Sequence, residues 1–269
     1  MQYDPVKRSL GKFFNQNTSL RKLFYHLLDL LLLRSWHVRK MLRKIKRDNP
    51  GIKTIIDAGS GFGQYVFYLS RLFPDAGIRG LDIKEEQIAD CNGFFKKTGR
   101  DKHIKFEYAD LTKLNEKETA DLILSVDVME HILEDTSVFK NFANALKKGG
   151  VLLISTPSDQ GGSDVHEEEE SSFIDEHVRD GYNINEITEK ILNAGFSSVE
   201  ARYSYGRPGK ISWRLSMKYP VMMVNCSKLF LVLLPFYYLI TFPFCLILNA
   251  IDVNTKHTTG TGLIVKAIR

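Results

Sequence analysis

The stretch Thr54-Ile55-Ile56-Asp57-Ala58-Gly59-Ser60-Gly61-Phe62-Gly63 decides how the rest of the chain is interpreted. An apolar run ends in an acid, glycines follow at alternate positions, and a helical apolar pattern begins at Tyr65. This order predicts a buried strand, a tight turn and the start of a helix. Glycine suits the turn because it adopts positive φ without strain and lets a ligand approach the backbone. The stretch therefore predicts the ligand-facing corner of an open α/β sheet.

The glycine spacing argues against a dinucleotide site. The fingerprint G-x-G-x-x-G, counted from Gly59, would place its last glycine at Gln64. Asp57 would also repel a pyrophosphate, whereas it suits a ligand with a cationic end, such as an amino group. An NAD-dependent oxidoreductase is therefore disfavoured.

Strand and helix patterns alternate after this corner and predict a parallel sheet covered by helices. The first helix follows the glycines, and three later ones are predicted at residues 84–95, 136–147 and 185–193. The predicted strands are residues 54–57, 77–83, 104–111, 120–127, 151–155, 198–205 and 260–268.

Acids end three of the later strands. Asp82 comes about 20 residues after the glycines, where a carboxylate can accept two hydrogen bonds from a ribose diol. The alternative is that Asp82 caps the helix that starts near Lys84. The third strand ends in Asp110-Leu111, and the fourth runs into Asp127-Val128-Met129-Glu130-His131-Ile132.

Together these motifs resemble the class I, Rossmann-like S-adenosylmethionine-dependent methyltransferases, in their small-molecule (quinone and polyketide) branch. The resemblance covers roughly residues 51–205 and 260–269 and rests on D-x-G-x-G-x-G, the acids after strands two and three, and D-x-x-E-H-I. The segments Leu146–Pro157 and His177–Tyr182 are also similar to the family. It implies a seven-stranded, mostly parallel sheet with helices on both faces and an antiparallel last strand beside the sixth.

The resemblance also implies the cofactor, S-adenosylmethionine, and its product S-adenosylhomocysteine. Its methionyl end would bind at Asp57, Gly59, Ser60, Gly61 and Gly63. Its ribose would bind Asp82, and its adenine would lie between Ile83 and Leu111 with Asp110 accepting from the amino group. The sulfonium would face Asp127 and Val128.

Acceptor-side roles are predicted for several further residues. His131, beside Glu130, is the candidate general base because imidazole titrates near neutrality. The alternative is that both residues only shape the loop. His37, His177 and Tyr182 are expected on the substrate side, and nothing in the sequence requires a metal.

Two segments lie outside the resemblance. Residues 1–50 are basic and helical, and we expect them to cover the sheet or form a lid, with contact to an anionic membrane surface as the alternative. Residues 206–259 form a hydrophobic insertion before the last strand, and Leu229–Ile251 carries no charge. This run is long enough to span a bilayer, but the last strand must rejoin the sheet, so we expect it not to span.

Pro235 and Pro243 are expected to divide the insertion into short helices. These helices would roof an apolar acceptor pocket, form a dimer interface, or lie on one leaflet as a monotopic anchor through residues 210–256. A membrane-facing roof would admit a lipophilic acceptor directly from the bilayer.

Composition limits the remaining choices. The chain has 269 residues, of which 43% are hydrophobic and 26% charged, as in one globular α/β domain with additions. Cys91, Cys226 and Cys245 form no C-x-x-C pair, so neither a zinc site nor a disulfide framework is predicted. The N-terminus lacks the pattern of a signal peptide. Nucleic acid is not expected as a partner, because no RNA-binding module or base-methylation motif is recognised.

We therefore expect a methyltransferase that acts on a small lipophilic acceptor, with O-methylation favoured. It would be cytoplasmic, with peripheral contact at the inner face of the membrane as a variant of that location. The alternatives are a non-catalytic S-adenosylmethionine-binding or membrane-associated scaffold protein and, less favoured, the NAD-dependent oxidoreductase.

Overall fold

The computed structural model describes residues 17–161 and 178–269. His177, predicted on the substrate side, and most of the polar loop before it lie outside the described residues.

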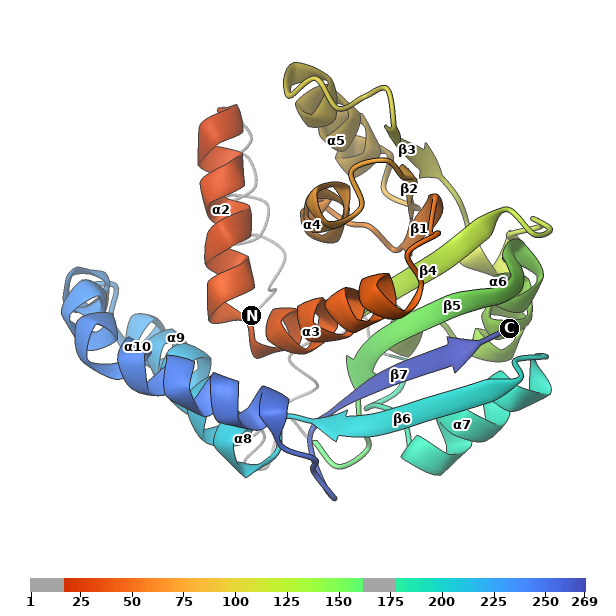
Figure 1. Cartoon of the computed structure of the whole chain (residues 1–269). Coiled ribbons are helices and arrows are strands. Elements are labelled where there is room, and N and C mark those ends of the chain that lie inside the picture. The colour runs from red at the N-terminus through yellow and green to blue at the C-terminus, as the bar shows by residue number, and fades with distance from the viewer. Residues whose placement is uncertain (1–16, 162–177) are drawn as a thin grey trace.

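The centre of the molecule is a seven-stranded sheet with the order β3-β2-β1-β4-β5-β7-β6 (Figure 1). Strands β1 to β5 are parallel to one another, and β7 runs antiparallel between β5 and β6. The predicted fold class is confirmed. The strands are β1 (Thr54–Ala58), β2 (Gly77–Asp82), β3 (Ile104–Tyr108), β4 (Ala120–Val126), β5 (Leu146–Pro157), β6 (Ser198–Ser204) and β7 (Gly262–Ile268).

Helices cover both faces of the sheet because both faces are apolar. In β1 the neighbouring residues Ile55 and Ile56 point to opposite sides and belong to separate buried clusters. The first cluster includes side chains of α3 (Leu33–Asp48), α4 (Gln64–Leu72) and α5 (Glu85–Lys97). The second includes side chains of α6 (Asp135–Ala145) and α7 (Ile184–Asn193).

The N-terminal helix α2 (Thr18–Leu31) is fixed to the turn between β1 and α4. The buried Arg21 donates from Nη2 to the Phe62 carbonyl oxygen at 2.8 Å and from Nη1 to Asp90 Oδ2 at 2.8 Å. The Tyr25 hydroxyl donates to the same Phe62 oxygen. These bonds hold α2 against the glycine turn.

The hydrophobic insertion forms a helical hairpin that projects from the sheet (Figure 1). Its outgoing arm consists of α8 (Arg207–Trp213), the π-helical turn η3 (Arg214–Lys218) and α9 (Tyr219–Cys226). Its returning arm is the single helix α10 (Phe230–Asn254).

The prediction that Pro235 and Pro243 divide this segment into short helices is wrong, since both lie inside α10. Each proline removes one backbone hydrogen bond and costs about 3 kcal/mol in a helix interior. Contacts with the outgoing arm offset this cost. The Tyr237 hydroxyl donates to the Leu215 oxygen at 2.7 Å, for example.

Candidate cofactor and acceptor site

The predicted acids meet at one edge of the sheet. Asp57 and Asp82 lie at the carboxyl ends of β1 and β2, and Asp127 directly follows β4. These strands are parallel, so their carboxyl ends share an edge, which is where ligands bind in open α/β sheets.

The glycine turn has the conformation that its sequence predicts. Gly59, Gly61 and Gly63 have φ values of 80°, 52° and 82°. A Cβ atom on Gly59 would also lie 2.2 Å from Val128 Cγ2. Glycine at position 59 therefore allows both the left-handed turn and the close approach of the loop after β4. The Gly59 and Ser60 amides donate to the Leu81 oxygen, at 2.8 Å and 2.9 Å, which ties the turn to β2.

Asp57 is a buried carboxyl group with an open acceptor position. Its side chain is 2% exposed, and its Oδ2 has no hydrogen-bond partner among the described residues. Burial, with a smaller contribution from the charge of Asp82, raises the pKa of Asp57 to about 8. A cationic amino group beside Oδ2 would ionise this carboxyl and pair with it. The residues present therefore fit the amino end of S-adenosylmethionine.

Asp82 joins the glycine turn to the start of α5. Its Oδ2 accepts from the Gly61 amide at 2.8 Å, and its Oδ1 accepts from the Lys84 amide at 3.0 Å. The helix-start role considered as an alternative is thus present. A carboxylate has about four lone-pair sites, so these two bonds leave room for a diol. The neighbouring Ile83 is 60% exposed and open to a ligand.

Asp110 and Leu111 lie at the end of β3. Asp110 Oδ1 accepts from the Thr112 amide at 3.0 Å and from its hydroxyl at 2.7 Å, so Asp110 caps the short 3-10 helix η1 (Leu111–Lys113). The hydrogen bonds with Thr112 hold the pKa of Asp110 below its usual range. Leu111 is buried. The predicted contacts of both residues with adenine stay predictions.

Replacing Asp82 with alanine is expected to weaken S-adenosylhomocysteine binding by roughly 100-fold. The variant loses a charged acceptor, and hydrogen bonds to charged groups contribute about 1.5–3 kcal/mol each. Calorimetric titration measures the loss, with NAD as a ligand that neither protein should bind. Circular dichroism checks that the variant is folded. Unchanged affinity in a folded variant would remove Asp82 from the cofactor site.

Asp127 begins the loop that is expected to face the sulfonium and methyl group of the cofactor. It has φ of 51°, which few residues other than glycine adopt, although aspartate tolerates it better than most. Its amide donates to the Ser155 oxygen at 2.9 Å. Its side chain forms an ion pair with Arg34 of α3, and both side chains are about one third exposed.

Glu130 and His131 lie together in the 3-10 helix η2 (Met129–His131). Glu130 is 1% exposed and accepts from the Thr156 hydroxyl at 3.1 Å. Burial raises the pKa of Glu130, against the opposing charges of His131 and Arg34. His131 is half-buried.

Tyr182 is fully buried beneath this loop rather than facing a ligand. Its hydroxyl lies 3.1 Å from the Met129 oxygen and 2.8 Å from Asp135 Oδ2. It therefore holds η2 against α6. A substrate contact by Tyr182 stays a prediction that this placement does not favour.

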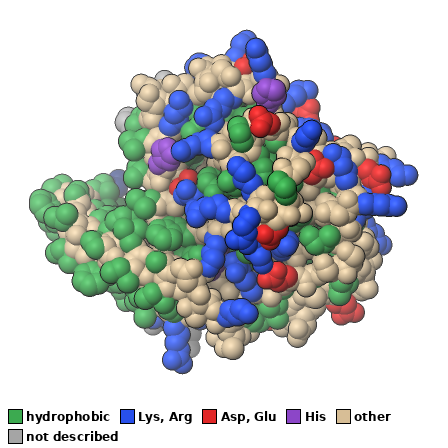
Figure 2. Space-filling view, in the orientation of Figure 1, with side chains coloured by type: hydrophobic (Ala, Val, Ile, Leu, Met, Phe, Trp, Pro, Cys, Tyr) green, Lys and Arg blue, Asp and Glu red, His purple; other side chains and the backbone are tan. Residues whose placement is uncertain are grey.

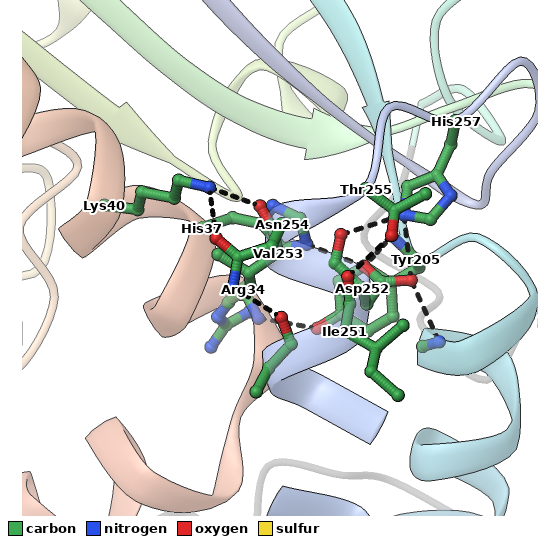
Figure 3. Close-up of polar contacts among 12 residues, drawn as sticks. Arg34, His37, Lys40, Tyr205, Ile251, Asp252, Val253, Asn254, Thr255 and His257 are labelled. Atoms are coloured by element: carbon green, nitrogen blue, oxygen red, sulfur yellow. Dashed lines mark hydrogen bonds and ion pairs between the residues drawn. The ribbon is translucent and has the colours of Figure 1, made fainter. Parts of the chain in front are cut away.

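His37 lies at the root of the hairpin, where Figure 3 shows its ring directed at Asp252 of α10. Its Nε2 is 2.8 Å from Asp252 Oδ1, and the side chain is buried. Burial lowers the pKa of His37 despite the nearby carboxylate of Asp252. The predicted substrate role of His37 is likewise not favoured by its burial.

Asp252 is the centre of this root and is itself 0% exposed. It also accepts from the Tyr205 amide at 3.2 Å and the Gly209 amide at 2.9 Å, and His257 Nε2 lies 3.1 Å from its Oδ2. Burial alone would raise the pKa of Asp252, but the bond with His37 and the other donors hold it below its usual range. This carboxylate ties α10 to α3, to the residue that follows β6, and to α8.

Arg34 is the site residue that the sequence analysis missed. Its amide donates to the Tyr205 hydroxyl at 3.0 Å, while its guanidinium reaches Asp127. Burial raises the pKa of Tyr205 to about 12, against the charge of Arg34. Contacts therefore run continuously from Asp252 through Tyr205 and Arg34 to Asp127. No local pattern distinguishes Arg34 from the other basic residues of its helix, because its position depends on how α3 folds across β4.

Comparisons with known proteins identify the family of this chain. Residues 51–197 match the family model described as a methyltransferase domain. The chain is 31% identical over 153 residues to phosphoethanolamine N-methyltransferase of Triticum aestivum, covering 56% of this chain and 29% of that protein. It is 31% identical over 113 residues to malonyl-[acyl-carrier protein] O-methyltransferase of Bacillus anthracis, covering 42% of this chain and 40% of that protein. The chain thus spans less than half the length of these curated relatives.

A solved structure shares the fold. Phosphoethanolamine N-methyltransferase 2 of Haemonchus contortus, in complex with phosphomonomethylethanolamine and S-adenosylhomocysteine, superposes with a TM-score of 0.57 at 19% identity. The match covers 86% of this chain and 52% of that one. The family match extends over the glycine turn and the acids at the ends of β2 and β4. The chain belongs to the methyltransferase domain family, as a class I S-adenosylmethionine-dependent methyltransferase.

Proposed function

We propose that this protein transfers a methyl group from S-adenosylmethionine to a small, lipophilic acceptor, with oxygen as the favoured nucleophile. The observation that supports a lipophilic acceptor is the line of contacts from the apolar hairpin to the cofactor edge. Asp252 at the hairpin root bonds to the Tyr205 amide, and Arg34 links Tyr205 to Asp127. An acceptor that enters along the hairpin would arrive beside the predicted position of the methyl group.

The chain's own task in this reaction is alignment, since S-adenosylmethionine supplies a methyl group that is already activated. In our proposal Asp57 holds the amino end of the cofactor, Asp82 holds the ribose, and the loop at Asp127 and Val128 faces the sulfonium. The other proposed cofactor contacts are Gly59, Ser60, Gly61, Gly63, Ile83, Asp110 and Leu111.

His131 is the proposed general base. It would take the acceptor's proton, while the carboxyl group of the neighbouring Glu130 would orient the ring. An acceptor that is already ionised would need no base, and then His131 would only help to orient the acceptor.

Arg34 supports a second proposed property of the acceptor, which is that it carries an anionic group. A guanidinium presents five N–H donors that match carboxylate and phosphate. The ion pair with Asp127 is partly exposed, and such pairs contribute only about 0–1 kcal/mol, so an incoming anion can replace it. The acceptors named for two relatives, phosphoethanolamine and the malonyl group on an acyl-carrier protein, both carry an anionic group.

Radiolabelled methyl transfer tests the proposal. The protein is incubated with methyl-labelled S-adenosylmethionine and either an organic-solvent extract or an aqueous extract of the source cells. We expect label in a solvent-soluble product that is absent with Asp82→Ala. Arg34→Gln should raise the acceptor KM at least 10-fold with little change in S-adenosylhomocysteine affinity, whereas Arg43→Gln on the same helix should change neither. Label found only in water-soluble products would rule out the lipophilic acceptor.

The proposal keeps the predicted division of the chain. Residues 51–205 and 260–269 would form the catalytic core, residues 1–50 its cover, and residues 206–259 the hydrophobic insertion. The protein would be cytoplasmic, with residues 210–256 in contact with the inner face of a membrane or with a second copy. A non-catalytic S-adenosylmethionine-binding scaffold is the second candidate, and cofactor binding without methyl transfer to either extract would favour it.

A further inference from the structure

The N-terminal helix α2 buries polar side chains and exposes apolar ones. Its buried residues are Arg21, Tyr25 and Asp29, which follow one another at intervals of four and therefore share one face of the helix. Leucines on the other side have exposed fractions of 39% to 51%, namely Leu23, Leu27 and Leu30. This is the reverse of the usual amphipathic helix, whose apolar face packs on the core. The inward face of α2 is therefore suited to directed bonds with one particular partner.

The partner of this inward face is the glycine turn between β1 and α4. Arg21 and Tyr25 both donate to the Phe62 carbonyl oxygen. Asp29 Oδ1 accepts from the side-chain amide of Gln64 at 2.9 Å. Phe62 and Gln64 stand on either side of the last glycine of the turn. All three inward residues of α2 are thus directed at the segment on which the proposed cofactor contacts lie.

Arg21 is the centre of this contact and is 2% exposed. Its Nε donates to the Tyr25 hydroxyl at 2.6 Å, and that hydroxyl donates onward to the Phe62 oxygen. Its Nη1 donates to Asp90 Oδ2 of α5 at 2.8 Å, and its guanidinium lies 4.6 Å from the centre of the Phe94 ring. A buried cation needs a paired charge, which Asp90 supplies. The remaining nitrogen, Nη2, donates to the Phe62 oxygen at 2.8 Å.

The bonds to the Phe62 oxygen fix the orientation of the peptide group between Phe62 and Gly63. The amide of the same peptide group donates to the Ser60 oxygen at 2.9 Å, so both of its polar atoms are held. Gly61 and Gly63 flank Phe62, and both have positive φ. Glycine loses more conformational freedom than any other residue when its backbone becomes ordered. A turn that α2 has already ordered loses less of this freedom on binding a ligand, and it therefore binds more tightly.

We propose that Arg21 and Tyr25 are positioning residues for S-adenosylmethionine. They act through the Phe62 carbonyl group, by holding the glycine turn in the conformation that binds the cofactor. Coupling between two binding events is reciprocal, so the bound cofactor in turn holds α2 on the domain. This inference rests on the proposed cofactor contacts of the glycine turn. It extends them by making the N-terminal helix a working part of the cofactor site.

Calorimetric titration of the full-length protein with S-adenosylhomocysteine tests the positioning role. Arg21→Met removes every donor of the side chain, and we expect the affinity to fall by about 10-fold or more, because hydrogen bonds from charged groups are the stronger ones. Tyr25→Phe keeps the ring and removes a single neutral donor, so the expected loss is about 3- to 10-fold. Arg21→Lys keeps the charge but not the fork of donors, and it should restore only part of the affinity.

Leu23→Gln, on the outward side of the same helix, is the matched control and should bind the ligand as the wild type does. Thermal melting reports whether each variant is folded. If Arg21→Met does not fold, Tyr25→Phe decides the question. Figure 2 shows a hydrophobic surface over the projecting hairpin, and exposed apolar surface of this kind promotes association. All proteins are therefore compared in the same mild non-ionic detergent.

Amide hydrogen exchange separates a positioning role from a general loss of stability. In ligand-free Arg21→Met the amides of the glycine turn should exchange faster, whereas those of β4 and β5 should exchange as in the wild type. In the wild type, saturating S-adenosylhomocysteine should slow exchange along α2, and the variant should show less of this slowing. Faster exchange throughout the sheet would show that Arg21 only stabilises the fold, and it would overturn the proposal.

Asp82→Ala, measured beside these variants, distinguishes failure of the positioning role from failure of the proposed cofactor site. If Asp82→Ala loses affinity while folded Arg21→Met and Tyr25→Phe keep it, the positioning role is wrong and the cofactor site stands. If none of the three variants loses affinity, the glycine turn does not bind the cofactor and both proposals are wrong. Loss of affinity in all three, with wild-type affinity in Leu23→Gln, supports both.

Discussion

Asp57→Asn is expected to abolish measurable S-adenosylhomocysteine binding at pH 8 while raising the melting temperature of the ligand-free protein. The wild-type carboxyl is buried without a partner for Oδ2 in the described structure, and its pKa is raised from 3.8 to about 8. At about 1.4 kcal/mol per pKa unit, this burial costs a few kcal/mol of stability at pH 8. Asparagine has the same shape and no charge, so the gain should be roughly 5 °C or more.

The pH dependence of this gain follows from the direction of the pKa shift. The folded protein keeps the Asp57 proton up to about pH 8, whereas the unfolded chain loses it near 3.8. Between these values the folded state binds more protons, so this residue makes wild-type stability fall as pH rises. Melting curves of both proteins should therefore coincide near pH 4 and separate toward pH 8.

Two results would contradict this account of Asp57. One is an equal difference in melting temperature at pH 5 and pH 8. The other is retention of wild-type cofactor affinity by the variant. Asp101→Asn, an exposed substitution remote from the site, should leave both quantities unchanged and serves as the control.

Asp252→Ala is expected to destabilise the protein by about 3–5 kcal/mol, the usual cost of breaking a buried ion pair or network by removing one partner. The substitution leaves His37 and the Tyr205 and Gly209 amides without their shared acceptor. Urea denaturation measures the loss. Asp252→Asn, which keeps one acceptor oxygen, should lose less, and Asp48→Ala at an exposed pair should lose little.

The effect of Asp252→Ala should shrink in acid. The folded-state pKa of Asp252 lies below its usual value, so its contribution is present above the unfolded pKa and is lost as pH falls through the folded pKa. The loss should therefore be largest near neutrality. A loss below about 1 kcal/mol at pH 7 would show that the hairpin root is not held by this carboxylate.

The sheet and the cofactor edge could be predicted from the sequence because their signals are local. The turn at Gly59 requires positive φ whatever surrounds it, and acids that end parallel strands must share an edge. The sequence defines the first and last residues of individual helices and strands less sharply. The helix predicted to reach Lys147 ends at Ala145, because Leu146 already pairs with Ala120 in the sheet.

The acceptor side could not be predicted in the same way, because it depends on contacts between distant segments. Arg34 reaches Asp127 only because the fold places the start of α3 beside the residue that follows β4. His37 has a side chain chemically suited to the substrate side, but its partner Asp252 lies 215 residues later. The continuity of α10 through two prolines likewise depends on packing against η3, which the sequence pattern does not encode.

The place of the hairpin between β6 and β7 makes the hairpin modular. Ser204 and Gly262 are register partners, so the ends of the insertion are already adjacent in the sheet. Doubling the length of such a connection costs only about 0.6 kcal/mol in closure entropy. A related enzyme with a short turn at this point could accept the whole hairpin by grafting, provided that its equivalent of α3 supplies a partner for Asp252. The same sheet can in this way gain or lose a large apolar surface without being rebuilt.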